Sequence, residues 1–480
     1  MSRSGAVAAA HPLAAAAARD VALRGGNAVD AAVAAQSVIC VTMPNAAGVG
    51  GDVLALVRSP DGAIAAVNGT GRSPAVWPTL GTGGAGDTVT VPGALAGWAD
   101  LNDRYGALAL HEVLEPAARL ARDGMIVDEA LVAAVATHRD RLRAVSPGCP
   151  VLDVARGERW TQPALAALLD RARETGPGAL YEADAAEAVS RAAVAAGGAL
   201  TAADLRTHTS MLTEPVTVGW AGARVHVQPP ASQGVLLAMA LQWLDGRWDD
   251  IDADVRDHVM AEVIGEVFAH RDECAARGAA LLGETLDVDT ERAATHRRGP
   301  RAYLHTAGVA TADSDGWVVS SLVSVFDGFG SAVHVPELGI FLNNRADGFT
   351  GGANAARPGA RPVHTLAPML ATRPDGSSLA LATPGADGQV QTLLQVTAHL
   401  RAGADLATAL SAHRWRSEDG NLLVEAGHPL GEALLGRGHR VLARPYGDGA
   451  FGSVVAAGLS PDTVPYSAAD PRRASVSLTW

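Results

Sequence analysis

Apolar residues recur at helical spacing in two stretches near the start of the chain. Residues 12–24 and 28–43 are rich in alanine and predict two helices that follow a short strand. Gly25-Gly26 is a typical helix end, and Asn27 is a typical N-terminal cap for the second helix. Because the second helix is apolar on nearly every face, we expect it to be buried inside a larger fold.

A strand-like alternation follows these helices. Residues 53–57 and 63–67 predict the two strands of a hairpin, joined by a Ser-Pro-Asp-Gly turn. Gly48, Gly50 and Gly51 precede the hairpin without the spacing of a phosphate-binding loop. They favour a close approach of two backbone segments instead.

The central region is mostly helical. Residues 88–91 predict a strand that ends at Pro92, and residues 215–228 predict a strand pair. Helical patterns cover residues 111–123, 128–143, 162–173, 184–196, 202–206, 232–245 and 252–276.

The pattern changes after about residue 284. Residues 285–303 are charged without an apolar period and predict an exposed linker. Strands are then predicted at residues 306–313, 317–326, 331–336, 339–344, 367–373 and 379–383, helices at 389–402 and 404–411, and two final strands. We expect one sheet in each half, both covered by helices, which gives an α+β fold with four αββα layers rather than a parallel Rossmann sheet.

Composition and charge restrict the classes of function. The 480 residues are 48% hydrophobic and 19% charged, which is typical of a large globular protein. The formal net charge of -13 makes nucleic acid an unsuitable partner. Cys40, Cys149 and Cys274 lie far apart, so we expect buried thiols rather than disulfides. No metal and no organic cofactor is indicated.

The N-terminal residues do not resemble an export signal. His11, Pro12, Arg19 and Asp20 interrupt the alanine stretch where a signal peptide has its apolar segment. No apolar run reaches the roughly 18 residues that a membrane-spanning helix needs. We therefore expect a cytoplasmic protein without a membrane partner.

Residues 304–331 read LHTAGVATADSDGWVVSSLVSVFDGFGS. By pattern alone this is a β-hairpin with a Ser-Asp-Gly turn, and Thr306 is an ordinary β-branched strand residue.

Several separate segments, in order, resemble the γ-glutamyltranspeptidase family. They are GAVAAAHPLAAAAARDVALRGGNAVDAAVAA, GVGGDVLALV, GTGRSPA, TVTVPGALAGWADLNDRYG, DGFGSAVHVPELGIFLNNRADGFT, RPVHTLAPML and ATPGADGQVQTLLQ. The resemblance covers most of the chain. It implies the four-layer αββα fold of the N-terminal-nucleophile hydrolases.

The resemblance implies a proenzyme that cuts itself between His305 and Thr306. A large subunit, residues 1–305, and a small subunit, residues 306–480, then form one layered fold as a heterodimer, and further dimerisation is left open. Thr306 is the implied nucleophile. Its new α-amine, with a pKa of about 7.7–8.0, serves as the general base.

Two further elements of the catalytic site follow from the resemblance. The family's oxyanion hole consists of successive backbone N–H groups, here those of Gly385 and Ala386 after Pro384. By itself this turn reads equally well as a surface turn. A second hydroxyl residue beside the nucleophile corresponds to Ser324, where the family has Thr.

The groups that hold a γ-glutamyl amine in the family are altered here. An Asn becomes Phe326, a Glu or Gln becomes Arg345, and an Asp becomes Gly348. Asn344 and Asp347, in the same segment, remain as expected substrate contacts.

The residues that would hold the substrate carboxylate also differ. The family's Arg aligns with Thr70, Arg72 stands two residues later, and a Ser-Ser pair becomes His364-Thr365. Arg72, Arg345 and His364 favour an anionic acyl group that lacks an amine.

We therefore expect an autoprocessed N-terminal-threonine hydrolase or acyltransferase with a non-standard small-molecule substrate. A glutaryl-like acyl group fits this expectation, as does a carbon–carbon bond beside a carbonyl, which related proteins cleave in antibiotic biosynthesis. An ordinary γ-glutamyl transferase or glutathione hydrolase, and an uncleaved inactive scaffold, remain as alternatives.

Overall fold

Two antiparallel sheets are stacked face to face at the centre of the molecule. The computed structural model describes residues 4–77, 84–293 and 306–480. The first sheet has the order β20 (Val476–Thr479), β1 (Gly5–Ala9), β9 (Ala307–Asp313), β10 (Val318–Ser324), β2 (Asp52–Arg58), β3 (Ile64–Asn68) and β6 (Met211–Thr213). The second has the order β19 (Pro465–Ala469), β18 (Val455–Leu459), β14 (Ser378–Ala382), β13 (Met369–Thr372), β8 (Ala223–Val227) and β7 (Val216–Trp220).

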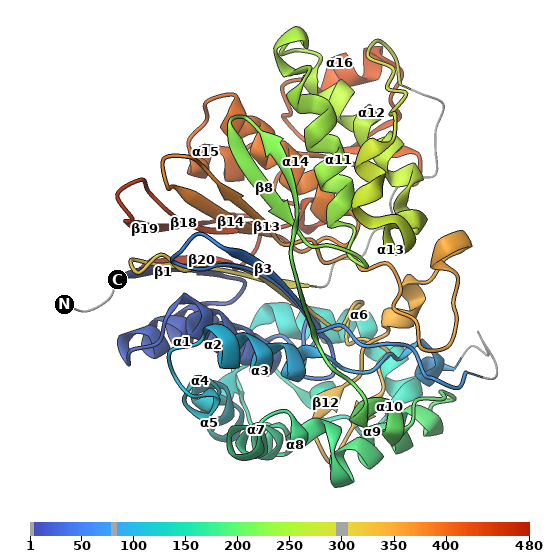
Figure 1. Cartoon of the computed structure of the whole chain (residues 1–480). Coiled ribbons are helices and arrows are strands. Elements are labelled where there is room, and N and C mark those ends of the chain that lie inside the picture. Colours follow the sequence, from blue (N-terminus) through green and yellow to red (C-terminus); the bar gives the residue numbers. More distant parts are fainter. Residues whose placement is uncertain (1–3, 78–83, 294–305) are drawn as a thin grey trace.

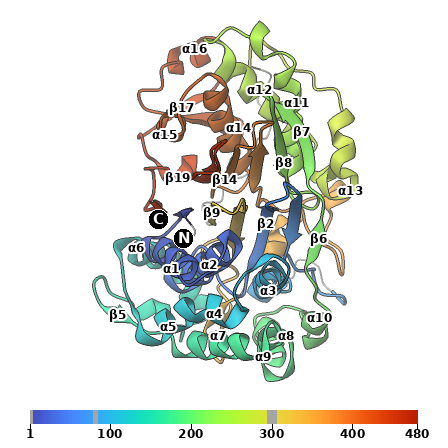
Figure 2. The ribbon, with the colours of Figure 1, turned by 60° about the vertical axis from the view of Figure 1, so that its left-hand side comes forward.

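Helices cover the outer face of each sheet (Figure 1). The first sheet is covered by α1 (Pro12–Leu23), α2 (Ala28–Thr42), α3 (Ala94–Tyr105) and the helices beyond them. The second is covered by α11 (Gly234–Asp245), α12 (Arg256–Ala269) and α14 (Gly388–Arg401). Figure 2 shows the same order of layers from another side. The predicted αββα sandwich is confirmed.

The remaining elements extend these layers. The further helices are α4 (Leu110–Val113), α5 (Glu115–Asp123), α6 (Glu129–Val145), α7 (Pro163–Thr175), α8 (Gly178–Tyr181), α9 (Ala183–Ala195), α10 (Ala202–Arg206), α13 (Cys274–Arg277), α15 (Leu406–Ser411) and α16 (Gly431–Gly436). The further strands are β4 (Met125–Ile126), β5 (Arg159–Trp160), β11 (His334–Val335), β12 (Ile340–Phe341), β15 (Trp415–Glu418), β16 (Asn421–Glu425) and β17 (Val441–Arg444).

The space between the two sheets is filled by alanine and leucine side chains. Examples are Ala310, Ala312 and Ala380 beside Leu54 and Leu322. In β9, β10 and β2 the even-numbered residues point into it, since side chains alternate along a strand. The same alternation decides which side chains at the strand ends face the second sheet.

Helix α2 confirms the prediction of a buried, capped helix. The Asn27 side-chain oxygen accepts hydrogen bonds from the amides of Val29 and Asp30 at 2.9 and 3.1 Å. Asp30 in turn accepts one from the Asn27 amide at 3.0 Å. This capping box places the helix against the first sheet, with every residue of the helix buried.

The expectation of one sheet in each half is wrong. Strands β1 and β2 from the beginning of the chain pair with β9 and β10, and the second sheet likewise mixes early and late strands. The pairing of Gly5 with Asp313 spans most of the chain. Such long-range pairing leaves no mark in a local pattern.

Three predictions of elements also need correction. Residues 88–91 form no strand, because the Thr90 amide donates to the Asn343 side chain at 3.1 Å instead of to a neighbouring strand. The helix predicted for residues 252–276 is interrupted after α12, at His270. After residue 411 the chain forms β15 to β20 rather than two strands, because short, mixed segments have too few residues to show a period.

The sequence also makes predictions about a linker and about the cysteines. Of the predicted linker, residues 285–293 form neither helix nor strand, and its continuation from residue 294 lies outside the described residues. The three cysteines are buried free thiols, as predicted. Within the described ranges, the helices are too short or too polar to cross a bilayer.

Candidate active site

Three polar side chains form a row across the end of the first sheet. Ser324 of β10 is paired with Asp52 of β2, and the pairing of Val323 with Ala307 places Ser324 opposite Thr306. All three are even-numbered positions, so their side chains face the second sheet. Directly opposed side chains lie about 4.5–5.5 Å apart at Cβ, which brings a hydroxyl, a second hydroxyl and a carboxylate together.

Thr306 is buried and hydrogen-bonded to its neighbour. It is 4% exposed, and its hydroxyl donates to Ser324 Oγ at 3.1 Å. Ser324 Oγ also accepts a hydrogen bond from the Phe326 amide at 2.9 Å. The two donors fix the position of the Ser324 oxygen. His305, the predicted residue before the cut, lies outside the described residues.

The glycine cluster before β2 permits close approach, as predicted. A Cβ on Gly51 would lie 2.2 Å from the carbonyl oxygen of Ser324, and one on Gly50 would lie 2.1 Å from that of Phe341. Real side chains do not tolerate such distances. These glycines therefore let the loop before Asp52 pass directly over the strand end that carries Ser324.

The predicted oxyanion turn lies at the same end of the sandwich. Strand β9 crosses β14 closely, since a Cβ on Gly308 would lie 3.3 Å from the carbonyl oxygen of Ala382. Thr306 is two residues before Gly308, and Gly385 is three residues after Ala382. The crossing therefore brings the start of β9 and the turn after β14 to one place.

The amides of this turn are available as donors. Gly385 and Ala386 have φ values of +131° and +49°, and among the described residues their N–H groups donate no hydrogen bond. The turn carbonyls are anchored, because Gln233 Nε2 donates to Ala386 O at 2.9 Å and the Gly388 amide donates to Gly385 O at 2.8 Å. The N-terminus of α14 follows directly and adds a positive partial charge.

Asp52 joins two of the predicted substrate-binding residues. Arg345 Nε donates to Asp52 Oδ2 at 2.9 Å, and His364 Nε2 donates to the same oxygen at 3.4 Å. The Leu366 amide donates to His364 Nδ1 at 3.1 Å, so the imidazole is neutral with its proton on Nε2. His364 is thus a hydrogen-bond donor here and adds no positive charge.

Burial and charge decide the protonation of this cluster. Burial and the charge of Arg345 lower the pKa of His364 to about 4. Burial alone would raise the pKa of Asp52, but the hydrogen bond from His364 and the charge of Arg345 bring it below its usual value. Asp52 and Arg345 therefore form an ion pair, and both side chains are 0% exposed.

Arg345 keeps two nitrogens unused. Within the described part of the chain, its terminal nitrogens Nη1 and Nη2 are buried and have no hydrogen-bond partner. The Phe326 ring stacks on the guanidinium, with the centroid 4.4 Å from Cζ. Phe326 has φ of +83°, a left-handed conformation that costs a side chain about 1–2 kcal/mol. A buried cation–π contact contributes about 2 kcal/mol and offsets this strain.

A second guanidinium faces the same cluster. Arg271 Nε donates to Asp387 Oδ1 at 3.1 Å, directly after the turn of Gly385 and Ala386. Its charge contributes, after burial, to the lowered pKa of Arg345. Arg271 thereby links the turn to the environment of Arg345.

A family model described as gamma-glutamyltranspeptidase matches residues 14–480. The chain belongs to this family. The acylase ACY 1 proenzyme of Pseudomonas sp. (strain SE83) is 31% identical over 487 residues, 91% of this chain and 87% of that protein. The glutathione hydrolase proenzyme of Escherichia coli (strain K12) is 26% identical over 515 residues, 94% of this chain and 88% of that protein.

Solved structures agree with the family assignment. Cephalosporin acylase from Bacillus halodurans has a TM-score of 0.86 at 28% sequence identity, and the match covers 100% of this chain and 96% of that one. The predicted family, its fold and an enzyme of its hydrolase and acylase kind are therefore confirmed.

The other residues predicted for this family's substrate site make local contacts. The Thr70 hydroxyl donates to Asn68 Oδ1 at 2.7 Å, and the Thr365 carbonyl accepts from Gln233 at 2.8 Å. Arg72 is exposed and donates to Gly359 O at 2.9 Å. Thr365 therefore belongs to the buried cluster, whereas Arg72 faces solvent.

Asn344 and Asp347 form a pair of their own. Asn344 Nδ2 donates to Asp347 Oδ2 at 2.8 Å, and Asn344 Oδ1 accepts from the Asp327 amide at 3.0 Å. Both residues line a cavity of about 580 Å³ that Trp77 and Asp87 also bound. Asn344 and Ala346, the chain neighbours of Arg345, both line this cavity, whereas Arg345 itself is not among its lining residues.

Asp52, Gln233 and Arg271 are site residues that the sequence reasoning missed. Asp52 had a usable signal, since it is a buried charge at the start of the strand DVLALVR, whose next five residues are all apolar. Gln233 and Arg271 had none, because their partners lie more than a hundred residues away in the chain.

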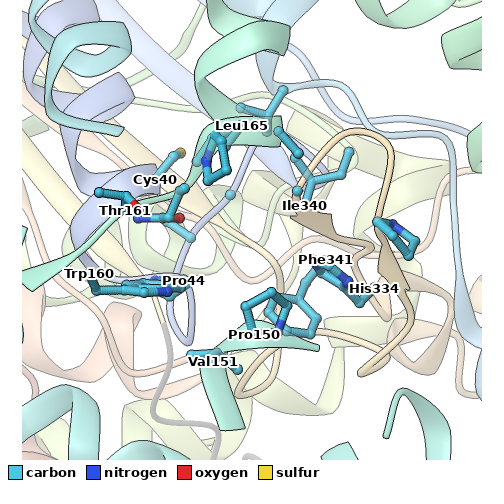
Figure 3. A pocket seen from close by; sticks show the side chains of 18 residues that line it. Cys40, Pro44, Pro150, Val151, Trp160, Thr161, Leu165, His334, Ile340 and Phe341 are labelled. Atoms are coloured by element: carbon cyan, nitrogen blue, oxygen red, sulfur yellow. The ribbon is translucent and has the colours of Figure 1, made fainter. Parts of the chain in front are cut away.

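An apolar cavity of about 420 Å³ lies on the helical side of the first sheet (Figure 3). The described residues that line it include Cys40, Trp160, Leu165, His334 and Phe341 and none of the predicted site residues. Burial raises the pKa of the Cys40 thiol and lowers that of His334 to about 4. Both groups are thus neutral, and the cavity holds no activated nucleophile.

Because His364 is neutral in the folded protein, we expect the fold to lose stability in acid. Its folded pKa of about 4 lies below the unfolded value of 6.5, so the unfolded state binds the proton first and unfolding becomes easier as the pH falls between these values. In His364→Gln this group is absent. We therefore expect the unfolding free energy of the variant to fall less steeply with decreasing pH than that of the wild type, by up to about 1.4 kcal/mol per pH unit. Urea unfolding at several pH values measures this slope.

The control for this measurement is His111→Gln, at an exposed position. It should keep the wild-type slope between pH 6.5 and 4. An unchanged slope in His364→Gln would show that the buried imidazole titrates normally.

Proposed function

We propose that the chain is a proenzyme that cuts itself before Thr306 and then hydrolyses or transfers an anionic acyl group without an α-amine. The observation that carries the substrate assignment is Arg345. Its two terminal nitrogens are buried without a hydrogen-bond partner among the described residues, next to the row that holds Thr306.

Self-cleavage requires an activated hydroxyl beside a peptide carbonyl. In the proposed step Thr306 Oγ1 attacks the carbonyl carbon of His305, the peptide nitrogen leaves as the new α-amine, and water hydrolyses the resulting ester. The contact of 3.1 Å with Ser324 supports this role, because it orients the Thr306 oxygen. The proenzyme relatives of Pseudomonas and Escherichia coli support a precursor of the same kind.

In the proposed turnover, Thr306 Oγ1 is again the nucleophile. The α-amine of Thr306, with a pKa of about 7.7–8.0, takes the hydroxyl proton as Oγ1 attacks the substrate carbonyl. The amides of Gly385 and Ala386 donate to the oxyanion that forms, which needs no movement of their anchored carbonyls. Water or an amine acceptor then releases the acyl group from Oγ1.

The surroundings of Arg345 oppose a γ-glutamyl amine. An ammonium beside Nη1 and Nη2 would meet two N–H donors and no acceptor, because Asp52, which balances the charge of Arg345, is already bonded to Nε and to His364. Phe326 and Gly348 offer no side-chain acceptor that would compensate an ammonium. A carboxylate instead receives two parallel hydrogen bonds from Nη1 and Nη2, while Nε remains on Asp52.

The relatives of this chain differ in the acyl group that their names give. The relatives include a glutathione hydrolase, an acylase ACY 1 and a solved cephalosporin acylase, so the fold serves more than one acyl group. The choice between them for this chain rests on Arg345 and Phe326. A glutaryl group, which has the carboxylate and lacks the amine, is the simplest candidate.

Paired chromogenic substrates test the proposal. We expect kcat/KM for glutaryl-p-nitroanilide to exceed that for γ-glutamyl-p-nitroanilide by about 100-fold, close to 3 kcal/mol. Arg345→Lys keeps a charge for Asp52 but loses the paired donors, so KM for the glutaryl substrate should rise about tenfold or more. Arg206→Lys, at a surface ion pair with Glu187, is the matched control and should behave as wild type.

Two other outcomes would support the alternative functions. Preferred turnover of the γ-glutamyl substrate would refute the anionic assignment and identify an ordinary γ-glutamyl transferase. An uncut chain without turnover of either substrate would favour the inactive scaffold.

A further inference from the structure

Two histidines and a glutamate lie close together in space, and none of them belongs to the row that holds Thr306. His258 and Glu262 lie one turn apart on α12, so their side chains leave the same face of the helix. His439 comes from the segment between α16 and β17, and its Nε2 lies 2.8 Å from Nδ1 of His258. One ligand atom from each of the three residues lies within 4.8 Å of the others.

Small movements would bring these three ligand atoms to the separations of a metal site, with the Glu262 oxygen, now within 4.8 Å, as the third ligand. Zinc binds imidazole nitrogen and carboxylate oxygen at about 2.0–2.2 Å, which at tetrahedral angles places ligand atoms about 3.4 Å apart. The observed spacing of 2.8 Å between the two histidine nitrogens would have to widen only slightly. The two rings are inclined by 68°, so neither ring covers the other's nitrogen.

The backbone holds His439 in place. The His439 amide donates to Leu434 O at 3.2 Å and the Gly438 amide donates to Leu435 O at 3.0 Å, which is the Schellman arrangement at the end of α16. Gly438 has φ of +96°, as this motif requires. His439 therefore follows a fixed turn, and His258 on α12 is only 1% exposed.

The three residues come from both sides of the proposed cut. His258 and Glu262 lie before residue 305, and His439 lies after it, 181 residues from His258. The end of the described large segment is also attached here, because the Ala293 amide donates to Arg437 O at 2.9 Å. Figures 1 and 2 both place α12 next to α16, at the outer side of the second sheet.

We propose that His258, Glu262 and His439 bind one zinc ion and thereby join the large and small segments. Two imidazoles and one carboxylate favour zinc over magnesium or calcium, which prefer oxygen ligands. Water would complete the coordination. The joining of two separate chains rests on the proposed cleavage, whereas metal binding itself does not.

Zinc binding to metal-free protein without a histidine tag tests the site. In a competition titration with a chelating dye we expect one zinc per chain, and Glu262→Gln and His439→Gln should each bind at least about tenfold more weakly. His111→Gln, at an exposed position, should bind as wild type. Magnesium should not compete.

A second measurement addresses the joining role. Zinc should raise the urea concentration at which the processed wild-type protein dissociates, and it should have no such effect on Glu262→Gln. Binding with equal affinity to wild type and both variants, or no saturable binding at micromolar zinc, would overturn the site.

The uncut Thr306→Ala chain separates the two proposals. It contains all three ligands, so it should bind one zinc whether or not Thr306 is the nucleophile. Zinc binding in a wild-type chain that never cuts itself would refute only the proposed function. A correctly cut protein that does not bind zinc would refute only the metal site.

Discussion

Thr306→Ala is expected to remain a single chain of 480 residues and to lose turnover. The substitution removes the oxygen that lies 3.1 Å from Ser324 Oγ, and with it both the attack on His305 and the acyl-enzyme. A denaturing gel should show one band where the wild type shows two. The rate with the preferred anilide should fall by at least about 1,000-fold, as expected when a nucleophile is removed.

Thr306→Ser is the matched control for this substitution. It retains the hydroxyl and the hydrogen bond to Ser324, so cleavage and turnover should both persist at reduced rates. Cleavage of the Thr306→Ala chain at the same bond would refute the assigned nucleophile.

Asp52→Ala is expected to destabilise the fold by about 3–5 kcal/mol. It leaves the Arg345 guanidinium 0% exposed without its anion, and it removes an acceptor of His364. The loss should appear as a lower urea midpoint. The measurement is best made in the Thr306→Ala chain, whose two parts remain covalently joined.

Two further variants test whether loss of the ion pair causes this destabilisation. Asp462→Ala removes an exposed carboxylate in the turn before β19 and should change stability by less than about 0.5 kcal/mol. Asp52→Ala combined with Arg345→Met removes both charges and should recover at least half of the loss. A change of less than about 1 kcal/mol in Asp52→Ala would contradict the described pairing.

The elements near Thr306 were predictable because their signals are local. The alternation of residues 306–326 and the Ser-Asp-Gly turn predict the hairpin, and Asn27 predicts the start of α2. Local signals could not show which strands belong to which sheet. The register of Gly5 with Asp313 depends on two segments whose side chains are mostly small and similar.

In the candidate site, too, local features could be predicted and long-range contacts could not. Hairpin register places Ser324 opposite Thr306, and the family resemblance points to Gly385 and Ala386. The partner of Arg345 could not be derived, because Asp52 lies 293 residues away. The neutral state of His364 likewise depends on the Leu366 amide and on burial, which exist only in the folded chain.

Phe326 and Arg345, two positions that the resemblance identifies as altered, contact each other in the structure. The resemblance implies an Asn at position 326 in the family, and Asn tolerates a left-handed backbone, whereas Phe326 adopts φ of +83° and stacks on Arg345. The two side chains therefore form one unit in the structure. Their coupling supports a changed acyl specificity more strongly than either residue alone.

The intact mass of the purified wild-type protein, measured in denaturant after brief exposure to glutaryl-p-nitroanilide, tests the central claim most directly. We expect two fragments whose masses, apart from a glutaryl adduct on the smaller one, add up to the full chain plus one water, with the smaller fragment beginning at Thr306. A single mass for the uncut 480-residue chain, or a smaller fragment that begins at another residue, would contradict Thr306 as the self-generated nucleophile.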